Sequence, residues 1–488
     1  MRHEIHHFVG LKPAFVLLFF GVGCTAPLRS PNLGTLYNRA ARHHDASRNP
    51  VVVIPGILGS KLKQSGTERV VWGAFSGGYA NPRTTDGARL VALPMREGAA
   101  LRDLTDDVLP NGVLDRVRVN LVGLPLELNA YTSILATLGA GGYRDEPLGR
   151  SGAVDYGDEH FTCFQFDYDW RRDLVESAQR LHEFLLARKD YVRGELRRRY
   201  GTDNPDLRFD IVAHSMGGLV ARYYLMYGDA DLPDDGKTPP VTWRGAELIE
   251  RVIIVGTPNA GSIKAFRQLV EGAEIAPIVP SYPPAVVGTM PAVYQLLPRA
   301  RHGNLRLASA DGRIIDPLDA EAWERFGWGL ASSNQDSVFA KLFPETPDRS
   351  TRRRVAIDHL RKCLDRARRF HEAIDASSTP PNHVRLHLFA GDAEETPNLA
   401  VIDVRTGRIA RVVNGPGDGT VSRSSALMDE REGGDWSPGL RSPIPWSGVT
   451  FLFRDHLGLT KDEAFSDNVL HLLLETDQSE VALTATGP

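Results

Sequence analysis

The stretch Ile211-Val212-Ala213-His214-Ser215-Met216-Gly217-Gly218 decides the fold. An apolar run leads into it, and helical periodicity without Pro or Gly follows it, which predicts a buried strand, a sharp turn and a helix. A serine on such a turn is a nucleophile elbow, written G-x-S-x-G, and the strained turn needs small residues two places before and after the serine. Ala213 and Gly217 meet that need. The stretch therefore predicts that Ser215 is a nucleophile; the alternative is a structural serine in a Gly-rich turn.

A serine hydroxyl needs a histidine base, and the base should follow the serine and the acid along the chain. Residues 449–453 have the pattern of a last strand, and His456 lies in the loop just after it. His471 is the alternative, but it lies inside a helical apolar pattern, which is typical of a packed or half-exposed helix residue. We therefore expect His456 to be the base.

The acid that orients the histidine has three candidates. Asp418 lies between glycines, in a loop tight enough to bring a carboxylate close to an imidazole. Asp392 directly follows a strand-like run, and Asp403 is a weaker third candidate. Spacing alone does not decide between Asp418 and Asp392.

The oxyanion formed during acyl transfer needs backbone donors from an earlier turn as well as from the elbow. Residues 51–54 are four β-branched residues in a row, which predicts a strand buried on both faces. Pro55-Gly56 ends that strand. We expect the N–H groups of Ile57 and Met216 to be the donors; the alternative is a plain strand-ending turn.

Five motifs occur here in one order: 55–60 (PGILGS), 167–171 (DYDWR), 213–218 (AHSMGG), 256–262 (GTPNAGS) and 417–421 (GDGTV). Together they resemble the lecithin:cholesterol acyltransferase family, which includes lysosomal-type phospholipase A2 enzymes. The similarity extends over roughly residues 50–475.

The resemblance implies an α/β-hydrolase fold: a mostly parallel central sheet with helices on both faces and a large inserted cap. It implies that Ser215 is the nucleophile, Asp418 the acid and His456 the base, and so it prefers Asp418 over Asp392. It also places the oxyanion donors on Ile57 and Met216.

Two of the motifs have a structural interpretation as well. The first, residues 164–171, is predicted to be a strand that runs into a polar, aromatic loop, where Asp169 and Arg171 pair to hold the loop. The second, residues 256–262, follows a strand over residues 251–255 and is expected to form a wall of the pocket.

Cysteine usage departs from the resemblance. The chain has three cysteines, Cys24, Cys163 and Cys363, so the disulfides of the secreted animal members are largely missing. Recognition of lipid surfaces through a disulfide-closed lid loop is therefore in doubt. In an oxidising compartment Cys163 and Cys363 could form a disulfide, and the sequence does not decide whether they do.

Composition narrows the class of protein. The chain has 488 residues, of which 42% are hydrophobic and 24% charged, which is typical of a globular protein with an ample core. Its net charge of −4 and the lack of a basic stripe argue against a nucleic-acid partner. We expect no cofactor and no functional metal site. The histidine-bearing stretches 3–7 and 42–45 are candidates only for adventitious metal, and we expect neither to lie in a packed region.

The N-terminus has the outline of an export signal. An apolar run of about ten residues is too short to span a bilayer and predicts a signal peptide over residues 1–24. Cys24 follows a small residue, as in bacterial lipoproteins, although Gly21 departs from that pattern. We expect lipidation at Cys24 and a location in the cell envelope; plain secretion or a retained N-terminus are the alternatives. Lipidation would anchor the protein to a membrane surface.

The rest of the chain divides into further segments. We expect a polar tether over 25–49, the first part of the core over 50–262 with an insertion near 72–142, a cap over 263–380, and the second part of the core over 381–488. Within the cap, residues 273–287 are apolar enough to line an acyl channel or to touch a membrane. Packing of the cap against the core is the alternative.

The sequence thus favours a serine-dependent acyl-ester hydrolase or O-acyltransferase that acts on lipid esters. An amidase or lactonase with the same three residues is the alternative. A catalytically silent binding module is less favoured, because none of the three is missing.

Overall fold

The computed structural model describes residues 30–73, 80–114, 116–121, 124–129, 131–149, 154, 156–274 and 281–476. The chain divides into two units, residues 1–31 and residues 32–488, and nearly all the described residues belong to the second. The expected signal peptide at 1–24, with Cys24, and the first residues of the expected tether lie outside the described residues.

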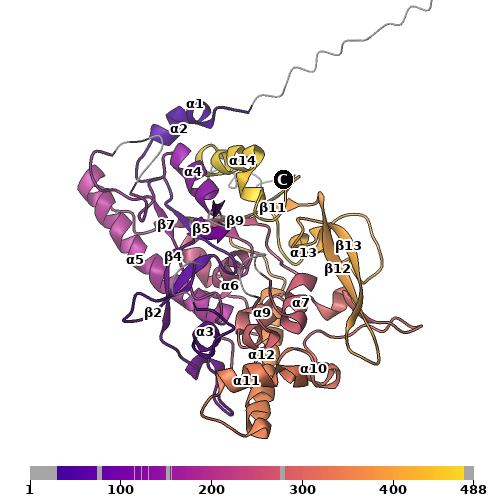
Figure 1. Ribbon diagram of the computed structural model, residues 1–488. Helices are drawn as coiled ribbons and strands as arrows, with labels where there is room; N and C mark the ends of the chain where they lie inside the picture. The colour runs from indigo at the N-terminus through magenta and orange to yellow at the C-terminus, as the bar shows by residue number, and fades with distance from the viewer. Residues whose placement is uncertain are drawn as a thin grey trace, which may run out of the picture. The chain divides into compact units, whose positions relative to one another are not determined.

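Six parallel strands form the central sheet, in the order β14-β11-β9-β8-β1-β7. Figure 1 labels β7, β9 and β11 among them. Their bounds are β1 Val51–Ile54, β7 Cys163–Gln165, β8 Phe209–His214, β9 Ile249–Val255, β11 Arg385–Gly391 and β14 Gly448–Leu452. Every residue of β1 is buried, as its four β-branched residues predict. Because the strands are parallel, their carboxyl ends meet at one edge, where ligands bind in sheets of this kind.

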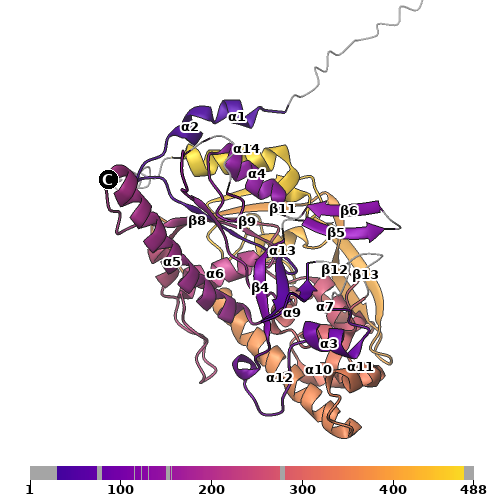
Figure 2. The ribbon, with the colours of Figure 1, turned by 60° about the vertical axis from the view of Figure 1, so that its left-hand side comes forward.

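Helices cover both faces of this sheet, because alternate residues of each strand point to opposite sides. Val51 and Val53 join the apolar cluster of α4 (Thr132–Ala140) and α14 (Glu463–Leu474). Val52 and Ile54 join the larger cluster, to which α5 (Leu174–Tyr200), α6 (Gly217–Tyr227) and α12 (Arg349–Ile374) contribute. Figure 2 shows the two sets of helices on opposite sides of the sheet. This is the expected α/β-hydrolase architecture.

The expected insertion near 72–142 contains a small antiparallel sheet, a hairpin and two helices. Its elements, with the neighbouring strand, are β2 Ser60–Gln64, β3 Val70–Trp72, α3 Thr85–Val91, β4 Val108–Val113, β5 Arg116–Leu121, β6 Leu124–Asn129 and α4. The sheet has the order β3-β2-β4. The last helix, α4, packs on the central sheet, so the end of this segment is part of the core.

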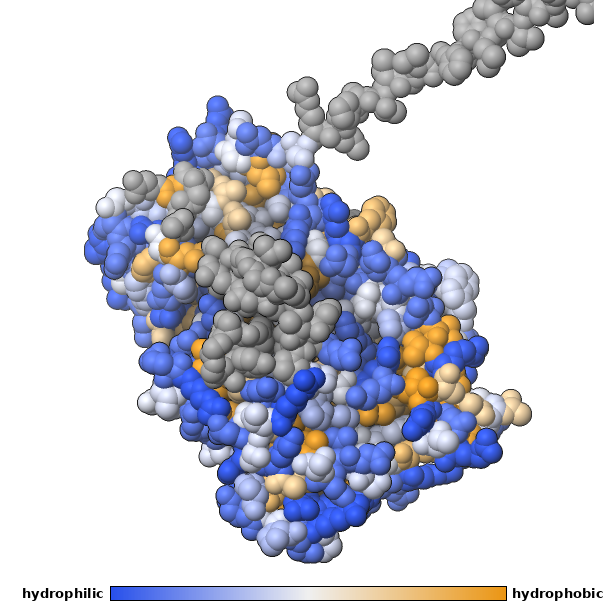
Figure 3. Space-filling model, in the orientation of Figure 1, coloured by the Kyte–Doolittle hydropathy of each residue, from blue (hydrophilic) through white to orange (hydrophobic). Residues whose placement is uncertain are grey.

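Helices dominate the expected cap over 263–380. They are α7 Ile263–Glu271, α8 Pro284–Val287, α9 Pro291–Gln295, α10 Ala320–Phe326, α11 Asp336–Leu342 and α12. One short strand, β10 (Leu305–Leu307), leaves the cap and pairs in parallel with β12 (Glu394–Ile402). β12 in turn pairs with β13 (Ile409–Gly417), and the short α13 (Arg423–Leu427) follows. Apolar side chains gather over β12 and β13 on the face seen in Figure 3.

The expected polar tether differs from the structure at residues 33–42. These residues form two short helices, α1 (Leu33–Leu36) and α2 (Asn38–Arg42). Between them, Tyr37 is buried, and its hydroxyl donates a hydrogen bond to Asp467 of α14 at 2.7 Å. Ala41 is also buried. Apolar and hydrogen-bonding side chains therefore hold this segment on the core, although its overall composition is polar.

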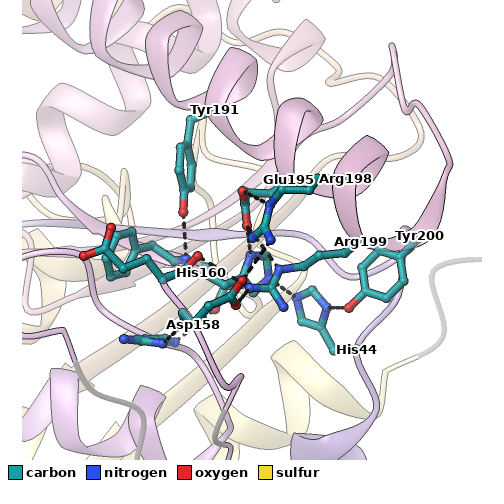
Figure 4. Close-up of polar contacts among 12 residues, drawn as sticks. His44, Asp158, His160, Tyr191, Glu195, Arg198, Arg199 and Tyr200 are labelled. Atoms are coloured by element: carbon teal, nitrogen blue, oxygen red, sulfur yellow. Dashed lines mark hydrogen bonds and ion pairs between the residues drawn. The ribbon is translucent and has the colours of Figure 1, made fainter.

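The expectation that His44 lies outside a packed region is wrong. Its Nδ1 lies 2.6 Å from the hydroxyl of Tyr200, at the end of α5, and its Nε2 lies 3.3 Å from Nε2 of His160 (Figure 4). The other ring nitrogen of His160 lies 3.0 Å from Glu195. This polar cluster holds the segment before β1 against α5.

The described residues contain neither a disulfide nor a helix suited to a membrane. Cys163 and Cys363 are buried free thiols. Burial raises the pKa of both thiols well above the ordinary value, so both are protonated at neutral pH. Among the described helices, none combines the length and the apolar character that crossing a bilayer demands.

Candidate active site

Ser215 lies on a strained turn between β8 and α6. Its φ of 54° is in the left-handed region, which costs a non-glycine residue roughly 1–2 kcal/mol. The chain can pack this closely because the second and third residues after Ser215 carry no side chain: a Cβ at Gly217 would overlap the carbonyl oxygen of Pro55, and one at Gly218 would overlap Thr257. The predicted nucleophile elbow is therefore present, and close packing explains its small residues.

The structure places the three predicted residues within hydrogen-bond distance of one another, in the order Ser215, His456, Asp418. Nε2 of His456 lies 3.0 Å from Oγ of Ser215, and Nδ1 of the same ring lies 2.8 Å from Oδ2 of Asp418. An ionised carboxylate only accepts, so Nδ1 carries the ring proton and Nε2 is free to accept the proton of the serine. This is the arrangement of a nucleophile, a base and an orienting acid. Their catalytic roles stay predictions.

The loop after β13 prepares Asp418 for this position. Its Oδ1 accepts hydrogen bonds from the N–H groups of Thr420 and Val421, at 2.9 and 2.7 Å. Burial raises the pKa of Asp418, but the nearby His456 and these two donors outweigh burial and lower it overall. The carboxylate of Asp418 is therefore ionised at neutral pH, as the orientation of the His456 ring requires.

The alternative residues bond elsewhere. The closest cation to Asp392 is Arg423, at 3.7 Å, and Asp403 accepts from the backbone of its own turn, at Arg405 and Thr406. His471 lies on α14 with an exposed side chain, 3.2 Å from Glu475. In the described hydrogen bonds, none of the three alternatives contacts Ser215 or His456.

The predicted oxyanion turn lies directly against the nucleophile. A Cβ added at Gly56 would lie 2.7 Å from Cβ of Ser215, so only glycine allows this approach. Among the hydrogen bonds of the described residues, neither the N–H of Ile57 nor that of Met216 has an acceptor. Both are thus available to a ligand, and their role as oxyanion donors stays a prediction.

Sequence reasoning missed residues that support the elbow. The hydroxyl of Thr257 donates to the carbonyl oxygen of Ser215 at 2.7 Å, and Gly256 has a φ of 57° beside the acid–base pair. A Cβ at Gly256 would lie 3.2 Å from Nδ1 of His456. Both residues belong to the motif at 256–262, so that motif was the available signal. Tyr131 and His214 also contact this region. His214 belongs to the motif at 213–218, which assigned it no role, and no sequence pattern identified Tyr131.

An apolar cavity of about 50 Å³ lies beside the predicted oxyanion turn. Residues from the turn, the core and the cap line it: Ile57, Leu58, Trp72, Trp170, Gln268, Ala273, Tyr282, Val287, Met290 and Val293. The apolar cap segment at 273–287 therefore contributes to this cavity through three of its described residues. The predicted pairing of Asp169 and Arg171 beside it is confirmed, at 2.7 and 2.9 Å.

Part of the chain matches a known protein family. Residues 154–315 match the model of the lecithin:cholesterol acyltransferase family. The resemblance is confirmed over that range, which begins before β7 and ends in the cap. It supports acyl-ester hydrolase or acyltransferase chemistry. Among the curated proteins, none matches the chain.

Solved structures resemble this chain to different degrees. A chain in the crystal structure of the Tle4–Tli4 complex is 16% identical; the match covers 91% of this chain and 100% of that one, with a TM-score of 0.54. The mature lipase BlEst2 of Bacillus licheniformis is 13% identical, with coverage of 88% and 94% and a TM-score of 0.30. EstA of Clostridium botulinum is 12% identical, with coverage of 92% and 99% and a TM-score of 0.30. At such identities only the first likeness bears on the fold, and none bears on the activity.

Proposed function

We propose that this protein is a serine-dependent acyl-ester hydrolase or O-acyltransferase that acts on lipid esters. The observation that carries the proposal is the line of hydrogen bonds from Ser215 through His456 to Asp418, at 3.0 and 2.8 Å. Acyl transfer through an enzyme-bound ester needs these three roles in this order.

In the first step, Oγ of Ser215 attacks the ester carbonyl while its proton passes to Nε2 of His456. The oxygen of the tetrahedral intermediate becomes negatively charged, and the N–H groups of Ile57 and Met216 are the donors we assign to it. The C–O bond to the alcohol then breaks, and His456 returns the proton to the leaving oxygen. The product is an acyl-serine.

In the second step, water or another alcohol attacks the acyl-serine. His456 takes a proton from the attacking oxygen and gives it to Oγ of Ser215 as the acyl–serine bond breaks. Asp418 holds the ring orientation in both steps and stabilises the imidazolium. Water yields a free acid, and an alcohol yields a new ester.

Two observations support lipid esters as the substrate class. The family whose model matches residues 154–315 is named for acyl transfer between lecithin and cholesterol. The apolar cavity begins at Ile57, next to the turn against which Ser215 lies, and tryptophan side chains line part of it. An apolar lining of this kind favours hydrocarbon over a polar acyl group.

The decisive experiment is the intact mass of the protein after treatment with a fluorophosphonate probe. Wild type should gain one adduct, and Ser215→Ala should gain none. Ser177→Ala is the matched control, because it removes a buried serine hydroxyl that donates only to the carbonyl of Asp173. That variant should label like wild type.

Turnover assays then define the reaction. Hydrolysis of short and long acyl esters that is lost in Ser215→Ala supports the proposal, and added alcohol that diverts product from acid to ester identifies transfer. Turnover of amides or lactones alone would replace the proposal with the alternative hydrolase. A wild type that folds, binds esters and takes up no probe, even with lipid vesicles present, would contradict it.

The proposal includes export to the cell envelope, with a lipid anchor at Cys24. Its support is the sequence pattern of a short apolar run followed by a small residue and a cysteine. The mass of the mature protein tests it, because Cys24→Ser should abolish acylation. A wild-type mass equal to that of the intact chain would contradict export.

A further inference from the structure

A buried chain of hydrogen bonds joins the predicted oxyanion turn to the loop that carries the base. The N–H of Gly56 donates to the hydroxyl of Tyr131 at 2.7 Å. That hydroxyl lies 3.2 Å from Nδ1 of His214, and Nε2 of His214 lies 3.2 Å from the carbonyl oxygen of His456. Tyr131 and His214 are both 3% exposed, so water does not compete for these bonds.

The two ends of the chain fix every proton in it. A backbone N–H only donates and a backbone carbonyl only accepts. The oxygen of Tyr131 therefore accepts from Gly56, and its own proton goes to Nδ1 of His214. His214 then carries its proton on Nε2 and donates it to the carbonyl of His456. A neutral His214 in this single tautomer satisfies all the donors and acceptors at once.

The surroundings keep His214 neutral. Burial lowers its pKa to about 3, with a further contribution from His456, whose ring centroid lies 4.9 Å away. His456 becomes positively charged in each step of the proposed reaction, while His214 stays uncharged beside it. The chain of hydrogen bonds therefore persists through the proposed cycle.

We propose that Tyr131 and His214 are positioning residues, which hold the turn of Gly56 and Ile57 at a fixed place relative to His456. The inference rests on the proposed function. Neither residue is a donor to the reacting carbonyl; Tyr131 contacts the backbone of Gly56, next to the proposed donor Ile57, and His214 contacts the backbone of the base. An enzyme of this class needs its oxyanion donors and its base aligned on the same carbonyl, and a 1 Å misplacement costs about 100-fold in rate.

Tyr131→Phe tests this, because it removes one oxygen and leaves the ring. We expect kcat for an ester to fall by about 10- to 100-fold, since the turn and the base lose their common link, while KM changes little. Tyr143→Phe is the matched control: Tyr143 is as buried, and in the described hydrogen bonds its hydroxyl contacts neither the turn of Gly56 nor His214. It should keep wild-type kcat.

Variants of His214 provide an independent test. His214→Gln retains an amide that can both accept and donate, so it should retain more activity than His214→Leu. The loss in Tyr131→Phe combined with His214→Leu should be smaller than the product of the single losses, because both break one chain. Thermal unfolding of each variant separates misplacement from loss of fold.

The outcomes are distinct. Equal kcat in Tyr131→Phe and wild type, or a loss matched by Tyr143→Phe, overturns the inference and leaves the proposed function intact. Multiplicative losses at Tyr131 and His214 also overturn it, because independent effects would show that no shared chain exists. A wild type without ester turnover would instead refute the proposed function.

Discussion

Asp418 and His456 are joined twice. The side chains meet at 2.8 Å between Oδ2 and Nδ1, and the backbone N–H of His456 donates to the backbone carbonyl of Asp418, also at 2.8 Å. The backbone bond holds the two loops together, and the side-chain bond orients the ring. The two tasks can therefore be separated by substitution.

Asp418→Asn should remove the side-chain bond that orients the His456 ring and leave the fold intact. An amide at this position favours the wrong ring tautomer, so kcat should fall by about 10⁴-fold, as when this acid is replaced in serine enzymes. The backbone bond survives, so thermal unfolding should change little. Ester turnover and an unfolding curve on the same preparation measure both.

Asp392→Asn is the matched control. Its carboxylate faces only Arg423, at 3.7 Å, so kcat should stay within about twofold of wild type. Should Asp392→Asn inactivate the enzyme and Asp418→Asn spare it, the assignment of the acid would be reversed.

Gly256→Ala should impair activity more than stability. The position has a φ of 57°, and the new Cβ would lie 2.9 Å from Leu459 and 3.2 Å from Nδ1 of His456. Relief of this crowding displaces the imidazole from Ser215. We expect a loss of at least tenfold in kcat/KM, since small displacements of a base cost that much.

Gly201→Ala provides the comparison for backbone strain. Gly201 has a φ of 65° at the end of α5, and a Cβ there meets nothing within 4 Å. Both alanine variants should lose roughly 1–2 kcal/mol of stability from the left-handed backbone. Only Gly256→Ala should lose activity; equal activities would show that the contact with His456 is harmless.

Arg171→Met should destabilise the protein strongly. Arg171 is fully buried and pairs with Asp169 and Asp106, at 2.7 and 2.8 Å. Its removal leaves the buried Asp169 with only the more distant Arg172, at 3.7 Å, as a counter-charge among the described ion pairs, which costs about 3 kcal/mol. Urea unfolding measures the loss.

Arg198→Met is the exposed counterpart. Arg198 pairs with Asp158 and Glu195 while its own side chain is 49% exposed. Exposed pairs contribute less than about 1 kcal/mol, so this variant should unfold close to wild type. A similar loss in both variants would show that burial does not set the cost.

Mild acid should destabilise the protein. Burial is the main cause that lowers the pKa of several histidines to about 3 or 4: His44, His214, His359, His371 and His387. Below about pH 6.5 the unfolded chain binds protons at these residues and the folded chain does not, so stability falls as the pH falls. Glu176 and Asp210 oppose this trend, because burial raises their pKa to about 7 and about 6. The histidines outnumber them, and we expect lower stability at pH 5 than at pH 7.

His371→Gln isolates one of these contributions. Between pH 6.5 and 5, the mean slope of unfolding free energy against pH should decrease by about 1 kcal/mol per pH unit, because one proton uptake is lost from the unfolded state. Urea unfolding at several pH values gives the slope. An unchanged slope would show that His371 binds its proton equally in both states.

The elbow was predictable because its chemistry is local. A left-handed serine and the crowding around Gly217 and Gly218 demand particular residues within a short stretch, and those residues are visible in the sequence. The parallel sheet was predictable for the same reason, since a strand buried on both faces, such as β1, has an unbroken apolar run.

The choice between Asp392 and Asp418 was not predictable from spacing, and the structure explains why. The hairpin of β12 and β13 begins just after Gly391 and returns the chain to the same place: a Cβ at Gly391 would lie 2.7 Å from Cβ of Asp418. Both aspartates thus flank one point at the end of β11. The length of a hairpin does not reveal which of its two ends carries the acid.

The link through Tyr131 could not be predicted at all. Tyr131 is 75 residues from Gly56 and 83 from His214 in the chain. A single buried tyrosine forms no sequence pattern that predicts its hydrogen-bond partners. The packed segment at 33–42 was missed for a related reason. Its average composition is polar, and two buried residues, Tyr37 and Ala41, suffice to hold it on the core.

The sheet of β10, β12 and β13 joins the cap to the loop that carries the predicted acid. Leu305, Arg306 and Leu307 pair with three consecutive residues of β12, and the same hairpin ends at Asp418. The half of the cap near β10 therefore cannot swing away without breaking backbone bonds and pulling on the acid.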